Sequence, residues 1–289
     1  MLDRCNYVLD NGTYHEESDM LSIDNRLREQ LGYEKRSEFV AQPYVDQEAD
    51  IRDHVLHLKF RFFSEEAVSG CRLALEEAAY TQGELNGNKI DMNPDGYYVD
   101  ECIQTIPLTD IKAGENELVL HMQFGKRTNL EWMYLLGEFG VQVMGPEKKL
   151  CKKPKTLYFG NYGEQGFPFY TGNLTYKMEV DNGGQDMLVG VPYYAGAALR
   201  VSLNGVKKGY IAFLPDEILI TDVPVGKNTL EITCLGNRFN GFGQVHLIGD
   251  DLAWVGADSW RTEGNSWAEE YQLKPMGILR APVIRTNHA

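Results

Sequence analysis

The sequence lacks the features by which membrane and secreted proteins are usually recognised. It has no run of about 20 apolar residues that could cross a membrane. Its first residues, MLDRCNYVLDNG, do not form the charged and then apolar segment of a signal peptide. We therefore expect either a cytoplasmic protein or an internal piece of a longer chain that carries a start methionine.

Basic residues are scarce. The chain has 28 Lys and Arg against 42 Asp and Glu, a formal net charge of −14. This balance disfavours nucleic acid and anionic membrane surfaces as partners, because both present negative phosphates. It is compatible with neutral ligands such as sugars, although an acidic surface is also an ordinary means of staying in solution. The basic run PEKKLCKKPK (146–155) contains two prolines and has the composition of a linker.

Motifs for metal, nucleotide or serine chemistry are missing as well. The five cysteines are scattered and lack Cys-x-x-Cys spacing, so we expect reduced, mostly buried thiols without a zinc site or disulfides. The six histidines show no ligand spacing, and no P-loop, dinucleotide-binding or nucleophile-elbow signature occurs. The oxygen-rich pairs Asp181-Asn182 and Asp250-Asp251 are compatible with a structural calcium ion and equally with ordinary turns. We expect no other cofactor.

The sequence does contain a motif that occurs twice, over 106–131 and 218–243. Both copies have a Thr-Asp pair, a Gly-x-Asn-x-Leu step and, after a one-residue slip, a Gly-x-Arg-x-Asn ending. A Leu-Asn-Gly turn precedes each copy. The matched positions are Thr109-Asp110 and Thr221-Asp222, Gly114 and Gly226, Asn116 and Asn228, Leu118 and Leu230, Gly125 and Gly236, Arg127 and Arg238, Asn129 and Asn240, with turns at Leu85-Asn86-Gly87 and Leu203-Asn204-Gly205. A repeat spaced by more than a hundred residues has the size of a domain, so it predicts two related domains in tandem.

Short stretches in which apolar and polar residues alternate predict strands in both copies. The predicted strands are 55–63, 71–78, 117–124 and 134–144 in the first copy, and 174–180, 187–193, 199–205, 210–214, 217–223 and 228–236 in the second. A helix is an alternative for 65–80 on pattern alone, and the aligned stretch 197–205 favours a strand. One short helix is predicted at 22–32, with a capping Ser or Asp and a closing glycine.

These elements predict an all-β chain made of two tandem antiparallel jelly-roll β-sandwiches. A lead-in segment at 1–45 contains the helix, and the first sandwich covers 46–147. A linker at 148–155 then leads into the second sandwich at 156–289. The last tail segment is expected to pair with the edge of that sandwich, because an unpaired apolar edge promotes aggregation.

The residues LNG, GYYVD (Gly96–Asp100) and IPLTDIKAGENELVL together resemble the jelly-roll sugar-binding domain of family 2 glycoside hydrolases. Such domains have a galactose-binding-like fold, and the resemblance covers most of residues 50–289. With GKRTNLEWMYLLGEFGV and the tail after Asp258, the pattern is similar to the C-terminal region of large bacterial glycoside hydrolases. The resemblance implies an accessory region, because the catalytic barrel of those enzymes needs ~250 residues of its own.

Sugar binding needs an aromatic face for the apolar side of the ring and planar polar groups for the hydroxyls. The tail and one loop combine these residue types. The candidates are Asp258, Trp260, Arg261, Trp267, Glu270 and Tyr271 in the tail, and Asn237, Arg238 and Asn240 in the loop. The alternative for the loop is that its repeated motif fixes a turn and an internal salt bridge. The alternative for the tryptophans is that they fill a domain interface.

A hydrolase acting alone would need two carboxylates roughly 5–10 Å apart across a sugar. The carboxylates with aromatic neighbours are Glu131, Glu138, Asp258, Glu263, Glu269 and Glu270, and surface charges are the favoured interpretation of each. We therefore predict a non-catalytic module that binds carbohydrate or braces a glycoside hydrolase catalytic domain. The alternatives are a structural or protein-interaction module and a small stand-alone glycosidase.

Overall fold

The computed structural model describes residues 1–35, 49–249 and 262–286. The chain divides into two compact units, each made of two stretches of sequence. Unit 1 is Met1–Lys153 with His246–Gln272, and unit 2 is Pro154–Val245 with Leu273–Ala289. The predicted scheme differs in two places: it set the lead-in 1–45 apart from the first sandwich and assigned the whole tail to the second.

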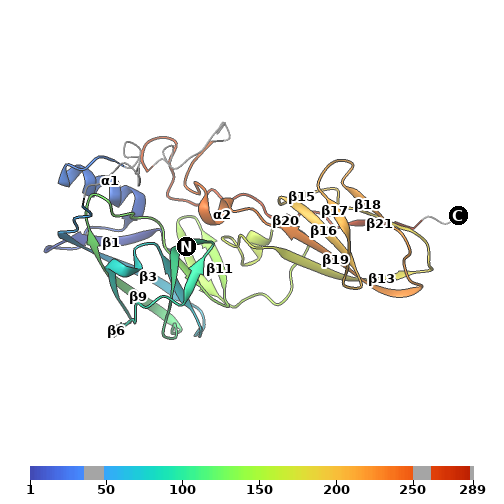
Figure 1. Cartoon of the computed structure of the whole chain (residues 1–289), viewed down its shortest axis with the longest axis horizontal. Coiled ribbons are helices and arrows are strands. Elements are labelled where there is room, and N and C mark those ends of the chain that lie inside the picture. The colour runs from blue at the N-terminus through green and yellow to red at the C-terminus, as the bar shows by residue number, and fades with distance from the viewer. Residues whose placement is uncertain (36–48, 250–261, 287–289) are drawn as a thin grey trace. The chain divides into compact units, whose positions relative to one another are not determined.

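The described residues of unit 1 form strands, one 3-10 turn and one α-helix (Figure 1). Its elements are β1 Arg4–Leu9, β2 Ser18–Asp19, α1 Met20–Leu31, β3 His54–Ser64, β4 Arg72–Leu75, η1 Ala78–Tyr80, β5 Thr81–Leu85, β6 Asn88–Lys89, β7 Gly96–Tyr98, β8 Asp100–Pro107, β9 Gly114–Phe124, β10 Tyr134–Leu136, β11 Gly140–Met144 and β12 Glu147–Cys151. The larger, 8-stranded sheet has the order β11-β12-β3-β9-β5-β6, and β1 and β2 extend it beside β3. The smaller, 4-stranded sheet has the order β10-β4-β8-β7.

The long strands β3 and β9 form the centre of the larger sheet and pair antiparallel along their whole length. Every second side chain points inward, as the pleat of a strand requires. Leu56 and Leu58 on β3, and Leu118 and Leu120 on β9, are almost completely buried. Each such side chain contributes about 1.5–3 kcal/mol to folding. The alternation that predicted these strands is therefore the pattern that forms the core.

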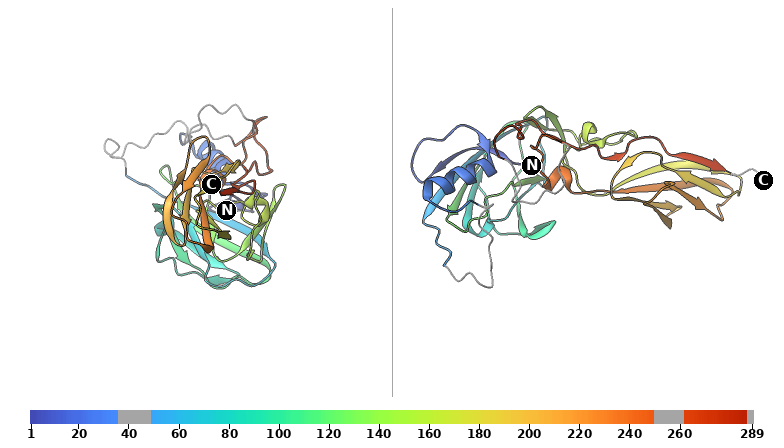
Figure 2. Two further views of the ribbon diagram at one scale, coloured as in Figure 1. Left: turned by 90° about the vertical axis from the view of Figure 1, so that its right-hand side faces the viewer. Right: turned by 90° about the horizontal axis from the view of Figure 1, so that it is seen from above.

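The lead-in belongs to the body of unit 1 because β1 pairs with β3 and α1 packs beside β1 and β2 (Figure 2). Helix α1 begins where the Asp19 carboxylate accepts hydrogen bonds from the backbone N–H groups of Leu21 and Ser22. It ends at Gly32, which has the left-handed φ of 70° typical of a C-cap. The helix predicted at 22–32 is confirmed, with its start two residues earlier.

Two local predictions need correction or refinement. The segment 71–78 forms a strand only over Arg72–Leu75 and then a 3-10 turn, so the helical alternative for 65–80 is wrong. The basic segment predicted as a linker is not one throughout, since residues Glu147–Cys151 form β12. This strand pairs with β11 and, in parallel, with β3, and long-range pairing of this kind leaves no mark in local composition.

Unit 2 is also built of short strands. Its elements are η2 Tyr162–Gln165, β13 Leu174–Asn182, β14 Met187–Gly190, β15 Tyr194–Ala195, β16 Ala198–Leu203, β17 Val206–Ile211, β18 Glu217–Ile220, β19 Gly226–Leu235, α2 Phe239–Phe242, β20 Gly277–Ile278 and β21 Val283–Thr286. The sheets have the orders β13-β19-β16-β17, β18-β14-β21 and β15-β20. Buried side chains such as Val189, Val201 and Ile232 form the core between them.

The end of the chain completes unit 2, as predicted, because β21 pairs antiparallel with β14. The turn at residues 181–184 joins β13 to β14 without forming a hairpin between them. Its flanking strands β13 and β14 belong to different sheets. Asn182 Oδ1 accepts a hydrogen bond from the Gly184 N–H (2.7 Å), so Asn182 stabilises the crossing between sheets. The pair Asp250-Asp251 lies outside the described residues.

The duplicated motif has the same structural role in both units. In unit 1 the side-chain N–H of Asn86 donates to Asn116 Oδ1 (2.9 Å), and its Oδ1 accepts from the Glu117 backbone N–H (3.1 Å). Asn116 in turn donates to the carbonyls of Lys112 (2.9 Å) and Gly114 (3.0 Å). These bonds fasten the Leu-Asn-Gly turn to the start of β9.

Unit 2 repeats these bonds, although Pro224 has no N–H and cannot donate to Asn228 as Lys112 does to Asn116 in unit 1. Asn204 donates to Asn228 Oδ1 (2.8 Å) and accepts from the Thr229 N–H (2.8 Å). Asn228 donates to the carbonyls of Pro224 and Gly226, both at 2.9 Å. Both turn asparagines have positive φ, 53° and 50°, which Asn tolerates better than most residues. The Leu-Asn-Gly and Gly-x-Asn-x-Leu parts of the repeat thus serve the fold.

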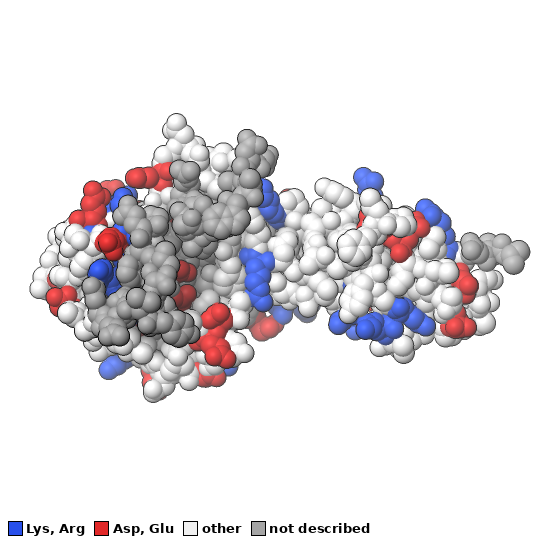
Figure 3. Space-filling view, turned by 45° about the horizontal axis from the view of Figure 1, so that its top comes forward, with Lys and Arg blue, Asp and Glu red and all other residues white. Residues whose placement is uncertain are grey.

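The all-β prediction is confirmed by these sheets. All five cysteines are free thiols, four of them buried and Cys102 exposed, as expected. No helix among the described residues has the length and apolar character needed to span a membrane. On the face shown in Figure 3, charged side chains of both signs are interspersed with uncharged surface.

Candidate functional site

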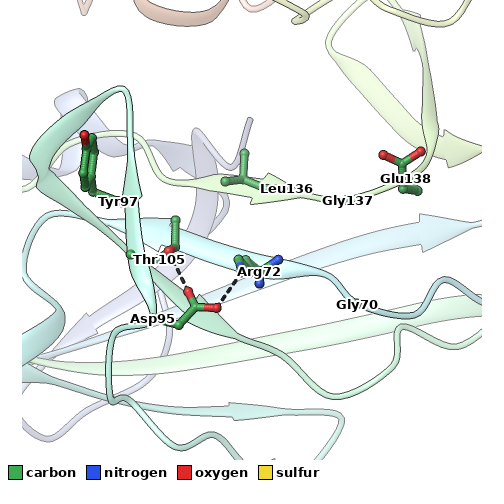
Figure 4. A pocket seen from close by; sticks show the side chains of 9 residues that line it. Gly70, Arg72, Asp95, Tyr97, Thr105, Leu136, Gly137 and Glu138 are labelled. Atoms are coloured by element: carbon green, nitrogen blue, oxygen red, sulfur yellow. Dashed lines mark hydrogen bonds and ion pairs between the residues drawn. The ribbon is translucent and has the colours of Figure 1, made fainter.

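A pocket of about 420 Å³ lies on the smaller sheet of unit 1 (Figure 4). Its size is within the range of about 300–1,000 Å³ that small-molecule sites occupy. All four strands of this sheet, and the segments next to them, contribute to it. The lining residues are Gly70, Arg72, Asp95, Gly96, Tyr97, Thr105, Leu136, Gly137 and Glu138.

An ordered polar group forms the middle of this pocket. Asp95 accepts a hydrogen bond from Thr105 Oγ1 (2.7 Å) and an ion-pair hydrogen bond from Arg72 Nε (2.7 Å), as Figure 4 shows. Strand pairing sets this geometry, because Thr105 on β8 lies opposite Gly96, the residue that follows Asp95. The bonds from Thr105 and Arg72 hold the pKa of Asp95 below its ordinary value, so this carboxylate stays ionised.

The Arg72 side chain is held at one edge and is available at the other. Its Nε is engaged by Asp95, whereas no hydrogen bond within the described part of the chain uses Nη1 or Nη2. About half of the side chain is exposed, at 49%. A planar guanidinium held in this way presents two fixed donors to a ligand.

Tyr97 and Glu138 lie at opposite ends of the pocket (Figure 4). Tyr97 is 60% exposed, so its ring offers an apolar face to solvent. Glu138 forms an ion pair with Lys153. Gly70 lines the pocket with φ at 70°, and a Cβ at this position would have no atom within 4 Å. The space above it is therefore open to a ligand.

A second hollow of about 760 Å³ is lined in part by residues 91–94, which directly precede residues 95–97 of the first pocket. Its walls include Thr81, Gln82, Lys89 and Asn93. It is the larger of the two, but no aromatic side chain lines it. The pocket with Tyr97 is the better candidate site, because it combines an aromatic face with oriented charged groups.

The predicted tail residues are divided between the described and undescribed parts of the chain. Asp258, Trp260 and Arg261 lie outside the described residues, and Glu270 is exposed. Trp267 is half-buried, with its ring 5.7 Å from that of His246. Tyr271 is turned inward, where its hydroxyl donates to Asp3 Oδ2 (2.7 Å). Burial raises the pKa of Tyr271, and its polar group is already engaged within the protein.

The predicted loop residues belong to unit 2. Asn240 is 1% exposed, and its amide both donates to the Lys274 carbonyl and accepts from the Lys274 N–H, each at 2.9 Å. Asn240 therefore holds the loop against the segment around Lys274. This agrees with the alternative that the repeated motif fixes the local structure of the loop. Asn237 accepts from the Phe239 N–H (3.0 Å), and Arg238 lies over the Phe242 ring at 5.9 Å. Asn237 and Arg238 are exposed, and their contact with sugar stays a prediction.

A buried polar cluster in unit 1 was not predicted. Asp3, Asp19 and His246 are at most 4% exposed, and their polar atoms lie within 4.8 Å of one another. Lys148 forms an ion pair with Asp3, and Trp132 Nε1 donates to Asp19 (3.0 Å). Asp3 and His246 are 243 positions apart, so no local spacing could reveal the cluster.

The cluster is suited to holding unit 1 together. Burial acts to raise the pKa of Asp3, but Lys148, His246 and Tyr271 outweigh it and lower that pKa well below its ordinary value. The Lys148 ammonium already supplies a positive charge to the Asp3 carboxylate. We therefore interpret these residues as a structural ion-pair network.

Comparison with known proteins identifies no family for this chain. No protein-family model and no curated protein matches it. Similar solved structures include a rhamnosidase from Novosphingobium sp. PP1Y, with 18% identity, a TM-score of 0.33, and coverage of 82% of this chain and 23% of that one. A β-D-mannosidase from Dictyoglomus thermophilum has 12% identity, a TM-score of 0.29 and coverage of 81% and 30%.

A family 2 β-galacturonidase from Eisenbergiella tayi is a third such structure, with 13% identity and a TM-score of 0.23. The alignment covers 80% of this chain and 35% of that enzyme. The chain thus spans about a quarter to a third of the length of these glycoside hydrolases. Similarity at this level identifies no activity, so function has to be inferred from the site.

Proposed function

We propose that the pocket between Tyr97 and Glu138 binds carbohydrate, and that the chain is a non-catalytic accessory region of a glycoside hydrolase. The observation that carries the proposal is the exposed Tyr97 ring beside the oriented group of Arg72, Asp95 and Thr105. An aromatic face suits the C–H side of a sugar ring, and planar polar groups suit pairs of adjacent hydroxyls.

The charged groups of the pocket favour binding over hydrolysis. A glycosidase needs one carboxyl group that stays protonated near neutral pH, with a raised pKa. The pKa of Asp95 is shifted in the opposite direction. Glu138, the other carboxylate of the pocket, is paired with Lys153. Asp95 therefore does not have the surroundings of a general acid.

Titration calorimetry with neutral and acidic sugars and their oligosaccharides tests the proposal. We expect at least one sugar to bind, and the Tyr97→Ala and Arg72→Gln variants to bind it at least tenfold more weakly, about 1.4 kcal/mol. Tyr210→Ala is the matched control, because Tyr210 is 52% exposed on a strand of unit 2. Absence of binding to every sugar, or equal affinity in all variants, would contradict the proposal.

A protein-interaction module is the second candidate. Phe213 and Leu214 are adjacent in unit 2 and each is 86% exposed, and neighbouring apolar side chains of this kind often contact a partner protein.

Turnover of aryl glycosides that is lost in the Glu138→Gln variant would instead support the stand-alone glycosidase.

A further inference from the structure

Two histidines on the larger sheet of unit 1 lie directly opposite each other. His57 on β3 pairs with His121 on β9. Their Nδ1 atoms are 2.5 Å apart, and the ring planes are inclined by 76°. The residues are 64 positions apart in the sequence, and only the strand register brings them together. This pair lies outside the candidate sugar site and is independent of the proposed function.

The contact between the two Nδ1 atoms limits their protonation. Two nitrogens this close can share one proton, so at least one of them offers a lone pair to the other. Neutral imidazole is the form that coordinates metal ions.

The surroundings of the pair are accessible and favourable to a cation. Both rings are half-buried on the outer face of the sheet. Gln82 on β5 is paired with His121 and supplies a third side chain in the same row. Two carboxylates lie nearby: Glu84 is on the same face of β5 as Gln82, and Asp10 interacts electrostatically with His57. The other charged group on the adjoining rows, Lys59, is paired with Glu117.

We propose that His57 and His121 form a binding site for a divalent first-row transition metal ion, coordinated through their two Nδ1 atoms. With bonds of 2.0–2.1 Å, cis ligands are about 2.9 Å apart in a square plane and about 3.4 Å apart in a tetrahedron. The distance between the two Nδ1 atoms therefore has to increase by roughly half an ångström for square-planar coordination. It has to increase by about twice as much for tetrahedral coordination. The site thus favours Cu²⁺ and Ni²⁺, which accept square-planar or tetragonal coordination, over Zn²⁺.

Calorimetric titration of the full chain with Ni²⁺ at pH 7.5, in a non-chelating buffer, tests this site. We expect one ion per chain, and at least tenfold weaker binding in His57→Gln and in His121→Gln. His15→Gln is the control, because His15 is exposed and stacks on Tyr7 with ring centres 4.7 Å apart. Mg²⁺ should not compete, since it prefers oxygen ligands.

Thermal unfolding provides a second measurement and verifies that the variants fold. Ni²⁺ should raise the melting temperature of the wild-type and His15→Gln chains, because an ion that binds the native state stabilises it. It should not raise that of folded His57→Gln or His121→Gln. Equal Ni²⁺ affinity in all four chains, or an equal rise in their melting temperatures, would overturn the proposal.

Discussion

At the residue scale, the duplicated asparagines show how a repeated motif can encode a fold without encoding a site. Asn86 and Asn116 in unit 1, and Asn204 and Asn228 in unit 2, use their amides to satisfy backbone groups next to a tight turn. Asn116 is 2% exposed and Asn228 is 1% exposed, so each would leave several polar groups without partners if removed.

We predict that Asn116→Ala lowers the free energy of unfolding of unit 1 by about 1–3 kcal/mol, the cost of unsatisfied buried polar groups. Asn228→Ala should have a similar effect on unit 2. Asn88→Ala is the control, because Asn88 is exposed just beyond the same turn as Asn86. Urea unfolding followed by fluorescence measures the three changes. Equal stability of Asn116→Ala and Asn88→Ala would show that the hydrogen-bonded pair does not stabilise the turn.

Asp19 should give unit 1 a characteristic pH dependence. Burial, with the neighbouring Asp3 carboxylate, raises the pKa of Asp19 to about 6 from its ordinary value of 3.8. The folded state therefore holds this proton more tightly than the unfolded state does. Its contribution to stability is full below pH 3.8 and is lost as the pH rises through about 6.

The variant Asp19→Asn isolates this effect, because asparagine can still cap α1 but does not titrate. Urea unfolding between pH 4 and pH 7 should show the wild-type chain losing stability relative to the variant, on the order of 2 kcal/mol in total. A stability difference that is constant over this range would mean that Asp19 titrates normally in the folded protein.

At the scale of elements, the sequence predicts strands well where one face is buried. The predicted strand 117–124 lies within β9, Gly114–Phe124, because alternation of apolar residues is both the signal and the cause. Strand β12 was missed because it contains two adjacent lysines, Lys148 and Lys149, and because its pairing with β3 is long-range. Composition alone gives that segment the character of a linker.

The candidate site was predictable only in part. Glu138 was among the candidate carboxylates, and Tyr97 belongs to the GYYVD stretch that carries the family resemblance. Arg72, Asp95 and Thr105 gave no signal, because they come from separate segments that only strand register brings together. The same holds for His57 and His121, whose distance in sequence hides their direct contact.

At the scale of the whole molecule, the chain runs through unit 1, then unit 2, then unit 1 again, and ends in unit 2. Residues 273–289 belong to unit 2, although the segment before them belongs to unit 1. In unit 2 they supply β20 and β21, including Ile278, which is completely buried in its core. The last strands are therefore an integral part of unit 2.

We predict that a chain shortened to end at Gln272 loses the folded structure of unit 2 and keeps that of unit 1. Without β21, β14 loses one of its two neighbours, and the core loses Ile278. Scanning calorimetry should show one unfolding transition fewer than in the full chain. A chain that lacks only residues 287–289 is the control. Two unchanged transitions in the shortened chain would contradict the prediction.

The buried contact between Asp3 and His246 also has a consequence for synthesis on the ribosome. The two residues are separated by 243 positions, which at 5–20 residues per second corresponds to a delay of roughly 10–50 s. N-terminal domains usually fold first, but during this interval Asp3 has neither His246 nor Tyr271 to contact. Unit 1 can complete its polar interior only after most of unit 2 has been translated, and incompletely folded nascent chains are generally prone to aggregation.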